Sequence, residues 1–117
     1  MSENKTSIES DPVSFVMDGN GEIVEWHPTA EALFGWTRAE AVGRRLSALM
    51  IPEHQREAHE QGLRRFLSAG IGKLLNKPLR LNVMHRDGHL FDVDFQIGAE
   101  QSASGYRFPT RTRAVTG

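Results

Sequence analysis

The chain has 117 residues, which fits one ordinary domain and is too short for two. Hydrophobic residues make up 38% of the chain and charged residues 25%, so its composition is that of a globular domain and not of a collagen-like, membrane or wholly disordered protein. Fourteen Lys and Arg residues against fifteen Asp and Glu residues give a formal net charge of −1. Since this charge would not attract nucleic acid or an anionic membrane, we expect the domain to bind neither directly.

The sequence contains no cysteine. This excludes a disulfide framework, a cysteine-based zinc site, a cysteine nucleophile and a flavin–cysteine adduct. The chain also has no apolar run near the roughly 18 residues that span a bilayer, and its start lacks the apolar core of a secretory signal. These features predict a cytoplasmic location.

The start of the chain divides into an arm and a hairpin. Residues 1–11 carry little apolar material, so we expect a flexible or helical N-terminal arm ahead of a domain over 12–117. Apolar and polar residues alternate over 13–17, the segment 18–21 favours a turn, and 22–26 has the character of a second strand. The domain is therefore predicted to open with a β-hairpin.

Three short helices are predicted after the hairpin. Thr29 is the expected N-cap of a helix over 30–34. The capping-box pattern from Thr37 to Glu40 opens a second helix, and the apolar stretch 46–50 gives a third.

One longer helix is expected over 52–69, with Pro52 at its first position and Gly70 beyond its end. At 100° per residue its inward arc contains an imidazole together with small and apolar residues. These residues are His59, Gly62, Leu63, Phe66 and Leu67. His59 is therefore predicted to point toward the interior.

The last third of the chain has the two-residue period of β-strands. Apolar and polar residues alternate over 79–84 and again over 91–97, on either side of a turn at 86–89. A fifth strand is predicted over 106–113, with Pro109 marking an unpaired or bulged position. The element order predicts an α+β domain in which helices form one layer and a five-stranded sheet the other.

Several segments, in this order, resemble the PAS family of sensory domains. They are Asp18–Trp26, Ala30–Trp36, Glu40–Arg44, Ile51–Glu53 with Arg56 and His59, and Arg86–Gly88. Together they cover about residues 12–116. The resemblance implies a five-stranded antiparallel sheet with the short helices and the long helix on one face, and a small cavity between the sheet and the long helix.

The resemblance also implies a function. PAS domains perceive a small molecule or partner, or dimerise, and relay the result to a separate output domain of a signal-transduction or transcription-regulatory protein, such as a histidine kinase of a two-component system, a helix-turn-helix regulator or a cyclic-nucleotide enzyme. Occupancy of the cavity would shift the population between two arrangements of the domain. The predicted ligand-pocket residues are Phe34, Trp36, His59, Leu63, Phe66, Leu74, Leu79, Leu81, Phe91, Val93, Phe95 and Ile97.

Haem is an alternative ligand. His59 resembles the proximal ligand of haem-binding oxygen-sensor PAS domains, and Arg65 stands where those domains place a propionate partner. Leu79 occupies the position of their distal-side arginine, which weakens this interpretation. A histidine bonded to backbone or water, and a ligand-free interaction module, are the remaining alternatives.

No enzymatic activity is predicted. The triplet His85–Arg86–Asp87 matches a kinase catalytic loop superficially, but it lies in a predicted hairpin without the other kinase motifs. The histidines and acids offer no i,i+4 histidine pair with a carboxylate on one face, so no metal site apart from haem is expected.

The outer sheet face suggests a partner. Val16 and Val24 are expected on it, and exposed apolar strand surface often marks an interface. We therefore predict a homodimer through this face and the N-terminal arm, which contains Ile8. Ala114 stands where the family carries an acid that anchors the onward linker, so coupling to the output domain is left open.

Overall fold

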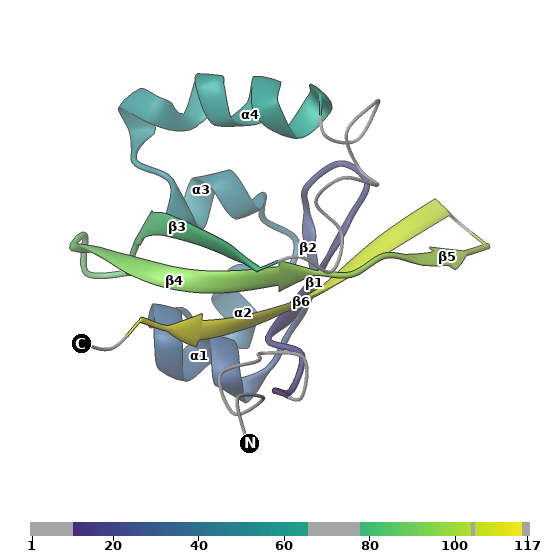
Figure 1. The fold of residues 1–117 in the computed structure, drawn as a ribbon, viewed down its shortest axis with the longest axis horizontal. Helices are drawn as coiled ribbons and strands as arrows, with labels where there is room; N and C mark the ends of the chain where they lie inside the picture. Colours follow the sequence, from purple (N-terminus) through teal and green to yellow (C-terminus); the bar gives the residue numbers. More distant parts are fainter. Residues whose placement is uncertain (1–10, 66–77, 104, 116–117) are drawn as a thin grey trace, which may run out of the picture.

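The structure is a computed structural model, and it describes residues 11–65, 78–103 and 105–115 (Figure 1). The elements are β1 (Phe15–Asp18), β2 (Ile23–Trp26), α1 (Pro28–Phe34), α2 (Arg38–Ala41), α3 (Leu46–Met50), the 3₁₀ turn η2 (Glu53–Gln55), α4 (Arg56–Arg65), β3 (Leu79–Met84), β4 (Leu90–Ile97), β5 (Glu100–Ser102) and β6 (Gly105–Ala114). Among these, no helix is long and apolar enough to cross a membrane.

The strands form one antiparallel sheet in the order β2-β1-β6-β4-β3, with β5 paired to β6. The last strand, β6, lies in the centre, where Thr110 is in register with Phe15 of β1 on one side and with Ile97 of β4 on the other. The predicted α+β class and antiparallel sheet are confirmed. The sheet has six strands instead of the five predicted.

The additional strand is β5, whose three polar residues show no apolar alternation that sequence analysis could detect. In the chain, β5 follows β4 after a two-residue break at Gly98 and Ala99. Pro109 lies opposite this break, and its carbonyl accepts a hydrogen bond from the Gly98 N–H at 2.8 Å. The irregularity predicted at Pro109 is therefore located opposite the junction between β4 and β5. The N–H that proline lacks is tolerated there because the strand pairing is interrupted.

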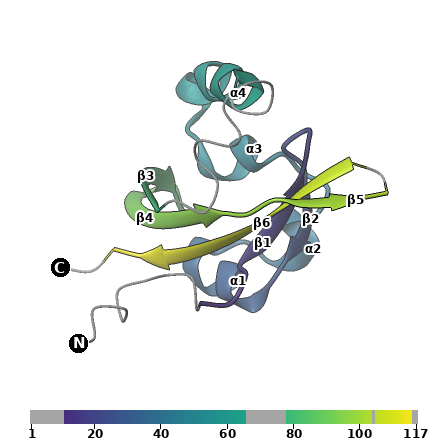
Figure 2. The same ribbon diagram turned by 45° about the vertical axis from the view of Figure 1, so that its right-hand side comes forward.

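Helices and strands share one core on the inner face of the sheet. The ring of Phe15 stacks on Trp26 with centroids 5.6 Å apart and meets the rings of Phe34 and Phe95 edge-on, at 6.4 Å in both cases. Buried residues of α1, α2 and α3 join the same cluster, namely Ala30, Phe34, Ala41, Leu49 and Met50. These three helices thus cover one sheet face, and both views show α3 lying between α4 and the body of the sheet (Figures 1 and 2).

Two predicted helix starts are wrong and two are confirmed, those of α2 and of α3, which spans Leu46–Met50 as predicted. Helix α1 begins at Pro28, with His27 in the cap position and no side-chain cap, so Thr29 lies inside the helix. Proline is favoured there because its missing N–H would have no helical partner. Pro52 precedes η2 and α4 begins only at Arg56, while the predicted end over 66–69 lies outside the described residues. The capping box between Thr37 and Glu40 is present.

The outer face of the sheet exposes less apolar surface than the sequence suggested. Val24 is 37% exposed as expected, but Val16 is only 5% exposed, so it offers little surface to a partner. The arginines on β6 are engaged within the chain: Arg107 pairs with Glu25, and the Arg113 guanidinium donates to both carboxylate oxygens of Asp11 at 2.8 and 2.9 Å.

Candidate ligand cavity

A cavity of about 560 Å³ lies between the sheet and the segment formed by α3, η2 and α4. Its volume is within the range of small-molecule sites. The apolar lining residues are Phe15, Met17, Leu46, Met50, Ile51, Ala58, Leu81, Val83, Phe95 and Ile97, and the polar ones are His54, Gln55, His59, Asn82 and Thr110. The site is therefore a mostly apolar chamber with a few hydrogen-bonding groups.

The strands form one side of the cavity. The antiparallel register sets Phe15 opposite Thr110, and the two-residue period of β4 places Phe95 and Ile97 on the same inner face. Ala58, His54 and Gln55 are exposed, which places the mouth of the cavity at η2 and the start of α4.

His59 is the polar group of interest because its Nδ1 is buried and has no hydrogen-bond partner among the described residues. Burial lowers the pKa of His59, and the neighbouring Glu60 carboxylate opposes this only in part. The imidazole is therefore neutral at pH 7, and Nδ1 can either donate or accept a hydrogen bond. The prediction that His59 points inward is confirmed.

An ion-pair network next to His59 holds α4 against α3. Arg45 donates to the two carboxylate oxygens of Glu60 from Nε at 3.2 Å and from Nη2 at 3.0 Å, and Ser47 donates its hydroxyl to the same carboxylate. The hydrogen bonds from Arg45 and Ser47 lower the pKa of Glu60. Because Glu60 follows His59 directly, this anchor fixes where the imidazole lies.

The predicted pocket residues fall into four groups. His59, Leu81, Phe95 and Ile97 line the cavity, whereas Phe34, Leu79, Phe91 and Val93 belong to the packed core beside it. Trp36 lines a separate, smaller pocket at the β3–β4 turn. Phe66 and Leu74, and the side chains of Leu63 and Arg65, lie outside the described residues.

Sequence analysis missed the lining residues of α3 and η2. Both elements are too short for a periodic pattern to reveal which side faces inward. The apolar pair Leu46 and Met50, four positions apart, was the available signal.

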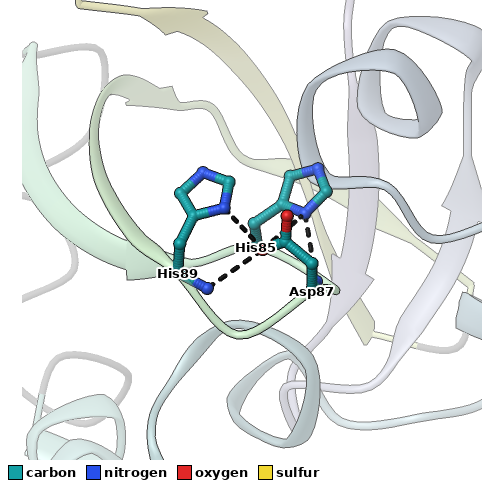
Figure 3. Close-up of side chains that lie close together, drawn as sticks. All are labelled: His85, Asp87 and His89. Atoms are coloured by element: carbon teal, nitrogen blue, oxygen red, sulfur yellow. Dashed lines mark hydrogen bonds and ion pairs between the residues drawn. The ribbon is translucent and has the colours of Figure 1, made fainter.

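The β3–β4 turn holds a cluster that the sequence analysis excluded. His85, Asp87 and His89 carry potential ligand atoms that all lie within 4.8 Å of one another (Figure 3). The expectation that no such histidine pair shares a face with a carboxylate is therefore wrong. It overlooked that residues four apart also meet across a three-residue hairpin loop, and not only on a helix.

Comparisons with known proteins agree with the fold. Residues 6–106 match the model of the PAS fold family. The chain is 34% identical over 102 residues to an uncharacterized protein of Azorhizobium caulinodans and 32% identical over 101 residues to the sensor protein FixL of Bradyrhizobium diazoefficiens. These matches cover 87% and 86% of the chain but only 13% and 20% of the two relatives.

A solved structure gives the same picture at the level of the fold. The PAS domain of the quorum-sensing receptor RpfR from Cronobacter turicensis, in complex with C12:0, superposes with a TM-score of 0.62 at 15% identity, covering 92% of this chain and 96% of that domain. The matching family model, the sheet order and the helices on its inner face lead to one conclusion. The chain belongs to the PAS family, and is a sensory domain of the kind found in signalling proteins.

Proposed function

We propose that this domain senses a small, mostly apolar molecule that carries one polar group, held in the cavity between the sheet and α4. The apolar lining would bury the body of the ligand, at about 25 cal/mol per Å² of apolar surface removed from water. His59 would bond the polar group. The proposal assigns binding to this domain and no catalysis.

The unpartnered Nδ1 of His59 is the observation that carries the proposal. A buried polar atom without a partner costs about 1–3 kcal/mol, which a ligand that reaches it would recover. A neutral imidazole also suits an otherwise apolar chamber, since a buried charge would be far more costly. The RpfR domain, of the same fold, is described in complex with C12:0, which supports an apolar chain as the body of the ligand.

The signal would leave the domain through β6. This strand pairs with β1 and β4, whose residues Phe15, Phe95 and Ile97 line the cavity, and its far end is tied to Asp11 through Arg113. Occupancy would shift the domain between two states only by the ligand's differential affinity for them. The chain covers only 20% of the sensor protein FixL, which supports a linked output domain, and we further propose a cytoplasmic homodimer.

The test is a titration of the chain with C12:0, followed by amide NMR shifts and by thermal unfolding. We expect shifts confined to the lining residues and a rise in the unfolding temperature with ligand concentration. Ala58→Trp would block the mouth of the cavity and abolish both effects. The control Ala48→Trp makes the same change at an exposed α3 position outside the lining and should bind as the unmodified chain does.

If the two variants bind equally, the cavity is not the site. If neither C12:0 nor other amphipathic molecules shift any lining residue, the domain is an interaction module with no ligand. Analytical ultracentrifugation with and without residues 1–11 would then test the homodimer directly.

Haem is the second candidate, because His59 presents an inward, neutral imidazole to an apolar cavity. The fit is partial. No arginine or lysine among the described residues lines the cavity to pair with the propionates, and Nδ1 lacks the hydrogen-bond partner that iron-ligating histidines usually have. Haemin titration decides between the two: a Soret band that is absent in His59→Ala supports haem, and one that persists in that variant rejects it.

A further inference from the structure

The β3–β4 turn brings two histidines face to face. Met84 pairs with Leu90 at the end of the hairpin, so His85 and His89 are the next cross-strand residues, on either side of the loop 86–88. Their imidazole rings stack with centroids 4.8 Å apart and planes at 17°. The turn is fixed by the His85 N–H bonded to the His89 carbonyl at 2.8 Å and by Gly88 at a φ of 99°. The backbone of the turn thus holds the two residues next to each other.

The carboxylate of Asp87 completes the cluster from inside the same loop. Its Oδ1 lies 2.5 Å from Nδ1 of His89 and 3.3 Å from Nδ1 of His85, and it also accepts the His89 N–H at 3.0 Å. Figure 3 shows both Nδ1 atoms turned toward this carboxylate. Two imidazole nitrogens and one carboxylate oxygen therefore converge on one point.

We propose that His85, Asp87 and His89 bind one divalent transition-metal ion, with water completing its coordination. Imidazole suits Zn²⁺, Ni²⁺ and Cu²⁺, and one carboxylate beside two imidazoles forms a three-ligand set that leaves positions open. The separations require only side-chain rotations to bring the three ligand atoms to about 2.0–2.2 Å from a shared ion. Neither Mg²⁺ nor Ca²⁺ is expected, because both prefer oxygen ligands.

The surroundings leave room for an ion and its waters. The side chains are 25% exposed at His85, 55% at His89 and 61% at Asp87, so solvent reaches the cluster. A small pocket lined by Gly35, Trp36 and the loop adjoins it.

Gly35 allows the end of α1 to lie close to His85, since a Cβ at position 35 would lie 2.5 Å from Cε1 of His85. The ion would replace two existing interactions, the Asp87–His89 contact and the hydrogen bond from the Asp87 N–H to Nδ1 of His85 at 3.1 Å. The site is separate from the ligand cavity, so the proposal does not depend on the cavity's function.

The experiment is calorimetric titration of the full chain with ZnCl₂ at pH 7.5, alongside imidazole NMR resonances. We expect one ion per chain and shifts of the His85 and His89 ring signals. His89→Gln and Asp87→Asn should each weaken the affinity by more than about 10-fold.

His54→Gln is the matched control, since it removes an exposed histidine outside the cluster and should leave the affinity unchanged. His89 is itself exposed, so His89→Gln is expected to fold; its far-ultraviolet circular dichroism checks this. The proposal is overturned if Zn²⁺ binds no better to the unmodified chain than to His89→Gln, or if His54→Gln weakens binding equally. MgCl₂ at the same concentration should produce no ring shifts, and equal shifts would also overturn it.

Discussion

At the scale of single residues, His59 shows what a helical pattern can and cannot predict. The inward arc of the long helix placed its imidazole correctly, because a position on a helix face follows from spacing alone. The missing partner of Nδ1 could not be predicted, since it depends on which groups of α3, η2 and the sheet approach the ring. The His85–Asp87–His89 cluster was missed for a different reason: the predicted hairpin brings residues four apart together, which helical spacing alone does not reveal.

Burial of His59 gives the first prediction, a dependence of stability on pH. Since its pKa is lowered in the folded chain, the unfolded chain takes up the proton first as the pH falls below the ordinary imidazole value of about 6.5. The free energy of unfolding should therefore decrease between pH 7.5 and 5.5, and less so in His59→Gln. The pKa of Glu60 is lowered as well, so the stability it contributes is lost only at more acidic pH.

Urea denaturation at the two pH values measures this difference. The control His54→Gln replaces an exposed histidine at the mouth of the same cavity and should retain the slope of the unmodified chain, because the effect is attributed to burial. An identical slope in His59→Gln would show that the ring is hydrated in the folded state.

At the scale of elements, local rules predicted what local contacts decide. The capping box opening α2 was predicted because Thr37 and Glu40 satisfy each other's backbone N–H groups with hydrogen bonds of 3.2 and 3.0 Å. The start of α1 was predicted two residues late, since the choice between Thr29 and His27 as the N-cap is decided by how the chain leaves β2. Strand β5 could not be predicted, because its three polar residues show no apolar alternation, although it pairs with β6 in a short local hairpin.

Two glycines allow steric contact to be separated from backbone strain. Gly35 and Gly43 have φ of 85° and 93°, but only Gly35 has His85 where a Cβ would lie. Both Gly→Ala variants should lower the free energy of unfolding by about 1 kcal/mol or more, because alanine is strained in the left-handed backbone conformation. Gly35→Ala should lower it by roughly 1–2 kcal/mol in addition, because its Cβ would contact His85. Chemical denaturation measures both. Equal losses would show that the β3–β4 turn moves away freely.

The anchor between α3 and α4 gives a third prediction. Glu60→Ala removes the acceptor of Arg45 and Ser47, so it should cost about 1 kcal/mol, a value reduced by partial exposure. Asp94→Asn, which weakens the more exposed pair with Arg80 on β3, should cost less. The two free energies of unfolding decide the comparison, and a larger loss in Asp94→Asn would contradict the role given to Glu60.

At the scale of the whole molecule, the fold could be predicted further than the site. The change of period between the helical segments and the last strands is strong enough to define an α+β domain, and the PAS motifs follow its element order. The central place of β6 and the cavity lining depend on how distant segments meet. Phe15 and Thr110 illustrate this, because they are 95 positions apart and no local sequence pattern indicates that both line the cavity side by side.

The pairing of Asp11 with Arg113 gives the last prediction, which concerns the route out of the domain. The Asp11 carboxylate receives two hydrogen bonds from Arg113 and its carbonyl one from Arg111, so the segment before β1 is tied to the end of β6. Asp11→Asn should loosen this end and speed amide hydrogen exchange over 110–115 by about 3-fold or more, with β3 unchanged. Glu60→Gln, which weakens the pair with Arg45 between α3 and α4, should leave the exchange of Val115 as it is. The resemblance to PAS domains implies an anchoring acid at the position of Ala114. A tie made by Asp11 would supply the anchor that this position lacks, and unchanged exchange in Asp11→Asn would remove that explanation.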